Sequence, residues 1–205
     1  MDNMTKSKTR KARFWLKPRQ VEKLRETTKG VSAGYLAPRN DLIIGLLYDS
    51  GLRVSELVAL NVAHIDLNEK IIMLPSDIQK QHSKGKGPDY VEMELSKGIS
   101  ADLNSYLANR WKNPKALFPS RESDRITTES VRNIVAKTAQ SADIRPYGIE
   151  GKGSAGDITP HTLRHSVAYR MLHHESGKTL YDVRNRLRHS SIITTERFYD
   201  HFVRV

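Results

Sequence analysis

Apolar residues recur along most of this chain at intervals of three and four positions, which places them on one face of an α-helix. The run LIIGLLY after Asp41 predicts a buried helix that ends at Asp49-Ser50-Gly51. The pair Thr159-Pro160 is typical of a helix cap followed by a first-turn proline. The predicted helices begin at or near Pro18, Asp41, Val54, Ile99, Thr128, Pro160, Leu180 and Thr194.

A different pattern, the alternation of apolar and polar residues, predicts strands in the first half of the chain. Ile65 and Leu67, the turn at Asn68-Glu69 and the apolar residues 71 to 74 favour a hairpin. Residues 91 to 95 alternate again and predict a third strand. The expected fold is therefore α+β and mainly α, with a small three-stranded antiparallel sheet.

Polar, glycine-bearing stretches between these elements are predicted to be loops: residues 29 to 37, 76 to 90 and 145 to 158. Residues 1 to 13 are polar and basic, and they favour a flexible arm that tracks DNA, with a start-site remnant as the alternative. We expect residues 14 to 205 to form one domain, since 205 residues suffice for one ordinary core.

The charge of the chain narrows the class of partner. Its 34 lysines and arginines exceed its 23 acidic residues by 11, which favours a polyanionic partner such as nucleic acid, and a basic protein with a merely solvated surface is the alternative. The absence of cysteine excludes disulfides, thiolate metal sites and a cysteine nucleophile. No apolar run has the length of a membrane span, so we expect a cytoplasmic, DNA-associated protein without a membrane partner.

Candidate chemistry gathers near the C-terminus, where six of the eight histidines lie between residues 161 and 201. His161, Arg164 and His165 have i, i+3 and i+4 spacing, so a helix would bring them onto one patch. Such nitrogen donors suit a phosphate, and we expect His165 to orient its neighbours. A zinc site is the alternative, but Thr162 stands where the metalloprotease helix has glutamate and a third ligand is missing, so no metal is predicted.

Arg53 is a second candidate, because it lies at the junction of two apolar helices, where a charged residue needs a carboxylate or a ligand. Glu56, three positions on, would provide a plain salt bridge, and a bound phosphate is the other reading. Among the aromatic residues near the C-terminus, we expect Phe198 rather than Tyr199 to pack in the core.

Several of these segments resemble one known family. HTLRH followed by LRHSSIITTERFY is similar to the C-terminal half of the tyrosine recombinase (phage integrase) catalytic domain, whose pattern is His-x-x-Arg, Leu-Gly-His and then a tyrosine. Tyr199 lies ten positions after His189, and SGLRVSEL resembles the family's first arginine motif. Arg188 occupies the place of the family's glycine, which would allow a positive φ after a helix.

This resemblance implies a catalytic set that needs no metal, cofactor or ATP: Arg53, Lys86, His161, Arg164, His189 and Tyr199. The two arginines would clamp the phosphate, His161 would serve as base and His189 would donate to a phosphate oxygen. Tyr199 would be the nucleophile, giving a 3′-phosphotyrosyl link and a free 5′-hydroxyl. Lys86 would be the general acid, with Lys80 and Lys84 as alternatives on the same connection.

The implied function is site-specific recombination or integration of double-stranded DNA, for a mobile element or virus. The resemblance implies a homo-tetramer on paired DNA sites, and we expect a monomer when the protein is free. It covers residues 14 to 205 as a catalytic domain, without the separate N-terminal core-binding domain of most integrases. A non-catalytic DNA-binding regulator and a topoisomerase-like relaxase remain the alternatives.

Overall fold

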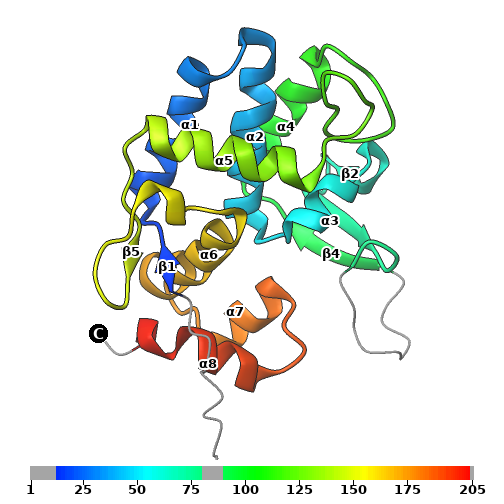
Figure 1. Cartoon of the computed structure of the whole chain (residues 1–205). Helices are drawn as coiled ribbons and strands as arrows, with labels where there is room; N and C mark the ends of the chain where they lie inside the picture. The colour runs from blue at the N-terminus through cyan, green and yellow to red at the C-terminus, as the bar shows by residue number, and fades with distance from the viewer. Residues whose placement is uncertain (1–12, 80–89, 204–205) are drawn as a thin grey trace, which may run out of the picture.

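The computed structural model describes residues 13–79 and 90–203, and these form a mainly helical domain with two small sheets (Figure 1). The α-helices are α1 (Pro18–Val31), α2 (Ala37–Ser50), α3 (Val54–Ala59), α4 (Lys97–Asn109), α5 (Thr128–Ser141), α6 (Pro160–His174), α7 (Leu180–Leu187) and α8 (Ile192–Val203). Short 3₁₀ turns occupy Gly34–Leu36, Val62–His64 and Ala155–Asp157. The strands are β1 (Phe14–Trp15), β2 (Ile65–Asp66), β3 (Ile71–Pro75), β4 (Tyr90–Glu94) and β5 (Tyr147–Gly148).

Helix α2 is the centre of the domain, because its middle is apolar all round and such a segment is stable only when it is covered on every side. Its residues Leu42, Ile43, Ile44, Leu46 and Leu47 are all buried. Helices α1, α4 and α6 pack against it, and α7 and α8 lie beyond α6 at the lower end of the molecule in Figure 1. None of the described helices is long and apolar enough to cross a membrane.

The predicted three-stranded antiparallel sheet is confirmed, with the strand order β2-β3-β4. Ile72 pairs with Met93, and both side chains are buried in the main core, as the alternating pattern requires. Strand β4 begins just after residues 80–89. The predicted general acid Lys86, like Lys80 and Lys84, lies outside the described residues, and so does the predicted basic arm up to residue 12.

The second sheet was not predicted. It consists of β1 and β5, which pair antiparallel with Trp15 opposite Tyr147. Strands of two residues are too short to show an alternating pattern, and β5 falls within residues 145 to 158, which were predicted to be a loop. Gly148 is required there, because a Cβ atom would lie 2.7 Å from the Gly151 carbonyl oxygen and 2.9 Å from the Phe14 ring.

The predicted loop over residues 29 to 37 is also partly wrong. Helix α1 continues to Val31, and α2 begins at Ala37, four residues before the predicted start at Asp41. Pro38 is compatible with this earlier start, because proline is tolerated in the first turn of a helix, where its missing N–H has no partner to lose.

A second apolar cluster joins α6, α7 and α8, and it includes Val167, Val183, Leu187 and Phe202. Tyr199 belongs to this cluster with an exposed fraction of 1%, whereas Phe198 is only half-buried against it. The expectation that Phe198 would be the core residue was therefore wrong. The fold buries the side chain that carries the candidate nucleophilic oxygen.

Candidate active site

Arg53 caps the N-terminus of α3, directly after the turn that ends α2. That turn needs Gly51, whose φ is +68° and whose place could not hold a Cβ atom, since Leu187 Cδ2 would lie 2.7 Å away. Arg53 Nη1 donates to Glu56 Oε1 at 2.9 Å, and the Arg53 amide donates to Oε2 at 2.8 Å. The predicted structural salt bridge is confirmed, and about a quarter of the Arg53 side chain stays exposed.

Glu56 is fully buried and also receives a hydrogen bond from the guanidinium of Arg188. Burial alone would raise its pKa, but the charge of Arg188 and the amide and charge of Arg53 together hold the pKa below its ordinary value. The carboxylate therefore stays charged and fixes one guanidinium on each side. Of these two partners of Glu56, the sequence predicted only Arg53.

Arg164 lies inside the molecule on α6, where its guanidinium joins two distant turns. Nη1 donates to the Gly51 carbonyl and Nη2 donates to the Leu187 carbonyl. Burial, followed by the nearby charges of Arg53 and Arg188, lowers its pKa to about 9. The group thus remains protonated at neutral pH, and two of its five donors fix its orientation.

His189 follows α7, whose C-cap is Arg188 with φ at +53°. The position of the family's glycine thus keeps the left-handed backbone that glycine favours, although the residue is arginine. The Arg188 guanidinium donates hydrogen bonds to Glu56 and to Met93 Sδ. His189 Nδ1 lies 2.9 Å from Thr195 Oγ1 on α8, and burial and then Arg164, Arg53 and Arg188 lower the His189 pKa to about 3.

The Tyr199 ring lies parallel to that of His189, with centroids 6.1 Å apart and planes at 3°. Its hydroxyl is 2.9 Å from His165 Nδ1. Burial raises the pKa of the phenol, and Arg164 and Arg53 oppose that change. Both arginines are therefore within electrostatic reach of the phenol, so the structure brings four of the six predicted residues, Arg53, Arg164, His189 and Tyr199, into one site.

His161 occupies the first turn of α6 and is exposed, and its ring stacks on His165 with centroids 6.2 Å apart. It lines an open cavity of about 1330 Å³ between the β5 loop and α8, together with His165 and Phe198. The basic residues Arg145 and Lys152 line the same cavity. His161 therefore lies where the site opens to this cavity, and its side chain is more exposed than that of His165.

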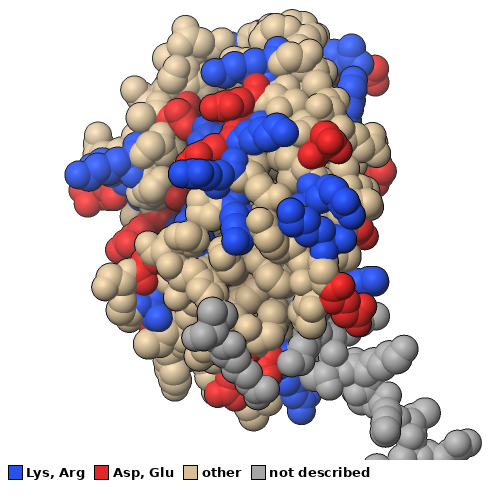
Figure 2. Space-filling view, turned by 90° about the vertical axis from the view of Figure 1, so that its left-hand side faces the viewer, with Lys and Arg blue, Asp and Glu red and all other residues tan. Residues whose placement is uncertain are grey.

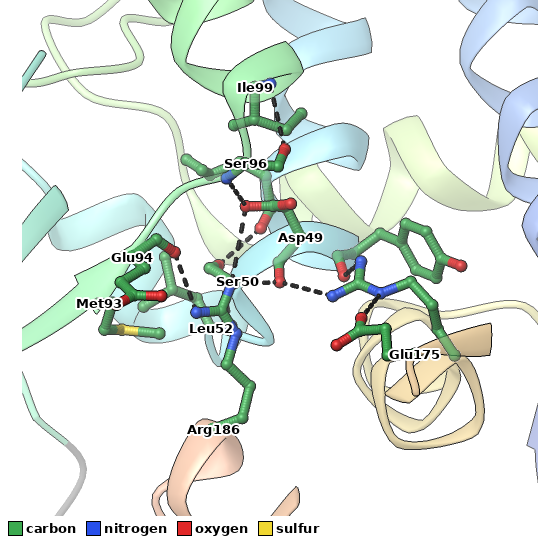
Figure 3. A network of polar contacts seen from close by, with 12 residues as sticks. Asp49, Ser50, Leu52, Met93, Glu94, Ser96, Ile99, Glu175 and Arg186 are labelled. Carbon is green, nitrogen blue, oxygen red and sulfur yellow. Dashed lines mark hydrogen bonds and ion pairs between the residues drawn. The ribbon is translucent and has the colours of Figure 1, made fainter. Parts of the chain in front are cut away.

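A polar network ties α7 to the rest of the domain and so positions His189 (Figure 3). Arg186 donates to the Glu94 carbonyl at 2.9 Å and to the Asp49 carbonyl at 2.7 Å. The Asp49 carboxylate accepts the Ser96 amide at 3.1 Å. The network joins the end of α2, the end of β4 and α7. Nothing in the sequence pattern pointed to it, because its acceptors are mostly backbone carbonyls.

The surface charge is mixed on the face that Figure 2 presents, where lysine and arginine side chains lie among aspartate and glutamate side chains. Among residues 13–79 and 90–203, no group of three or more histidine, aspartate or glutamate side chains could hold a metal ion.

With this geometry in hand, comparison with known proteins decides the family. The model of the phage integrase family matches residues 14–204. The chain belongs to this family.

The curated proteins that the chain resembles include tyrosine recombinases. The chain is 34% identical to tyrosine recombinase XerC of Psychromonas ingrahamii over 170 residues, 81% of this chain and 50% of that protein. It is 32% identical to XerC of Chlamydia caviae over 166 residues, 78% of this chain and 46% of that protein. The chain thus spans about half the length of the curated relatives it matches.

Solved structures agree with this placement in the phage integrase family. The crystal structure of XerA recombinase superimposes with a TM-score of 0.68 at 26% identity, covering 93% of this chain and 62% of that one. XerH site-specific recombinase bound to difH substrate gives a TM-score of 0.68 at 22% identity, covering 92% of this chain and 51% of that one, and shares the fold.

Proposed function

We propose that this chain is the catalytic part of a site-specific DNA recombinase that cleaves and rejoins double-stranded DNA through a 3′-phosphotyrosyl bond at Tyr199. One observation carries the proposal. Four residues from separate places in the chain lie within electrostatic reach of one another: Arg53, Arg164, His189 and Tyr199. The names of the curated relatives and the family membership support it.

The two guanidiniums would hold the non-bridging oxygens of the scissile phosphate. They are suited to this because Arg164 is held by two carbonyls and Arg53 by Glu56, so little reorganisation is needed when charge develops in the transition state. Burial, followed by the charges of Arg164, Arg53 and Arg188, lowers the pKa of His189 and keeps the ring neutral. In the tautomer that carries its hydrogen on Nε2, His189 Nδ1 accepts from the Thr195 hydroxyl and Nε2 would donate to a phosphate oxygen.

The leaving 5′ oxygen needs a proton, and Lys86 is the proposed donor, with Lys80 and Lys84 as alternatives. Bond energy is conserved in the phosphotyrosyl link, so the reaction runs without ATP or metal. We further propose a homo-tetramer on paired DNA sites, a DNA-associated cytoplasmic location and a source in a mobile element or virus. Residues 14 to 205 would form the catalytic domain, preceded by the basic arm.

The test uses a pool of nicked duplexes that contain a randomised segment, because nicking prevents rejoining and traps the covalent product. Protein is added, the reaction is quenched with detergent, and DNA that remains attached to protein is recovered and sequenced. We expect Tyr199→Phe to form no attached product while it still retards DNA, because it removes one oxygen. Tyr181→Phe is the matched control and should behave as the wild type, since Tyr181 is an exposed side chain on α7.

Other outcomes separate the alternatives. DNA that is retarded but never attached would favour a non-catalytic regulator. Relaxation of a supercoiled plasmid without exchange between duplexes would favour a topoisomerase-like relaxase. Attachment that survives in Tyr199→Phe would refute the assignment of the nucleophile.

A further inference from the structure

The Tyr199 hydroxyl is held by a histidine that the family motif does not assign to the reaction. His165 Nδ1 lies 2.9 Å from the phenol oxygen, and the two rings meet edge to face with centroids 5.7 Å apart. The imidazole is also nearly parallel to the rings of His161 and Phe198, with centroids 6.2 Å from each. These ring contacts and the hydrogen bond to the phenol favour the orientation of His165 in which Nδ1 faces the Tyr199 hydroxyl.

The surroundings of His165 determine which partner carries the hydrogen. Burial lowers its pKa to about 3, and the charges of His161, Arg164, His189 and His201 act in the same direction. These groups come from α6, from the segment after α7 and from α8, the elements that surround the ring. The imidazole is therefore neutral at physiological pH, and its Nδ1 lone pair is available to accept the phenol hydrogen.

From this contact, and on the basis of the proposed function, we propose that His165 is the proton acceptor for Tyr199 in strand cleavage. The phenol O–H bond breaks and its proton passes to His165 Nδ1 while the oxygen bonds to phosphorus. The bond from phosphorus to the 5′ oxygen breaks, and that oxygen takes a proton from the cationic general acid. In rejoining, the 5′-hydroxyl attacks, and the His165 imidazolium returns its proton to the departing phenolate.

Substrate binding itself would prepare this step. A phosphodiester held by Arg164 brings a negative charge to one of the groups that disfavour a proton on His165, so the proton affinity of the imidazole rises when DNA is bound. In the absence of DNA the phenol stays neutral in its apolar surroundings. The resemblance gave the role of base to His161, and this proposal moves it to His165, because the Tyr199 hydroxyl contacts His165 while the exposed His161 ring lines the open cavity.

The kinetic test compares His165→Asn with the wild type on a duplex selected from the randomised pool. Asparagine retains an acceptor oxygen near the position of Nδ1 but cannot take up a proton. We expect attachment to slow by roughly 100- to 10,000-fold at neutral pH, with unchanged DNA retention. The variant's rate should climb steadily with pH as the phenol ionises, whereas the wild-type rate should level off once His165 is neutral. His174→Asn, an exposed histidine on the same helix, is the matched control.

Two further measurements separate proton transfer from a merely structural role. A fluorinated tyrosine at position 199 is a stronger acid, so it should restore much of the rate of His165→Asn and little of the rate of His161→Asn. A rate for His165→Asn within a few-fold of the wild type, or equal rescue of both variants, would overturn the proposal.

The last readout does not depend on activity. Nitrogen NMR of histidine-labelled protein, assigned with His165→Asn, should find the His165 hydrogen on Nε2 and a higher His165 pKa when inorganic phosphate is added. A hydrogen on Nδ1, or a pKa that phosphate leaves unchanged, would overturn the role of His165. A wild-type protein that attaches to no member of the pool would instead refute the proposed function, so the two failures are distinguishable.

Discussion

Glu56→Gln should destabilise the domain strongly, although it changes one oxygen to a nitrogen. The carboxylate is fully buried and accepts from the guanidiniums of Arg53 and Arg188 and from a backbone amide. Glutamine keeps one acceptor, removes the charge and turns a donor toward these donors. Breaking a buried ion pair costs about 3–5 kcal/mol, and the partly exposed Arg53 favours the lower end, about 3 kcal/mol.

The assay is urea unfolding at pH 7, with a thermal scan in parallel. A loss of about 3 kcal/mol corresponds to a fall in Tm of roughly 6–12 °C for a domain of this size. Glu129→Gln is the matched control, because Glu129 also pairs with an arginine three positions away on a helix, but both side chains are more than half exposed. That change should cost less than about 1 kcal/mol.

The pH dependence gives a second check on the same variant. The folded-state pKa of Glu56 lies below its unfolded value, so its stabilising effect is present above the unfolded pKa and is lost as the pH falls through the folded pKa. The difference between wild type and Glu56→Gln should therefore shrink in acid. A loss at pH 7 no greater than that of Glu129→Gln, or a difference that grows in acid, would refute the account of Glu56.

Three further predictions concern the site. Arg164→Lys should reduce DNA attachment by about 100-fold or more. A lysine ammonium cannot bridge the Gly51 and Leu187 carbonyls and clamp a phosphate at the same time. A near-normal rate in the detergent assay would contradict this. Arg188→Gly should destabilise the domain by about 1 kcal/mol despite relieving the positive φ, since the lost hydrogen bond to a buried carboxylate contributes about 1.5–3 kcal/mol. When Glu56→Gln is already present, urea unfolding should instead show that Arg188→Gly increases the stability. Lys86→Ala should be slow on normal DNA and nearly normal when sulfur replaces the bridging 5′ oxygen, because the sulfur leaving group needs no proton. Equal slowing on both substrates would mean that the same test is applied to Lys84 and Lys80.

The amino-acid sequence alone was sufficient for the elements with strong periodicity and for most of the candidate site. Helix α2 could be predicted from the apolar run after Asp41, β3 from the apolar residues 71 to 74 that follow a turn, and β4 from the alternation of apolar and polar residues. Arg53, Arg164, His189 and Tyr199 could be selected because the resemblance is carried by the spacing of several motifs in a fixed order. The Arg53–Glu56 pair could be predicted because it is local, three positions apart on a helix.

Tertiary packing decided what depends on residues far apart in the chain. The β1–β5 sheet joins segments over 130 positions apart and is too short to leave a periodic pattern. Arg188, the C-cap of α7, meets Glu56 on α3, and Arg186 on α7 reaches Asp49 at the end of α2, only because the chain folds back on itself between these distant positions. The burial of Tyr199 and its contact with His165 depend on how α8 lies on α6, since helical spacing defines a face but not the partner of that face.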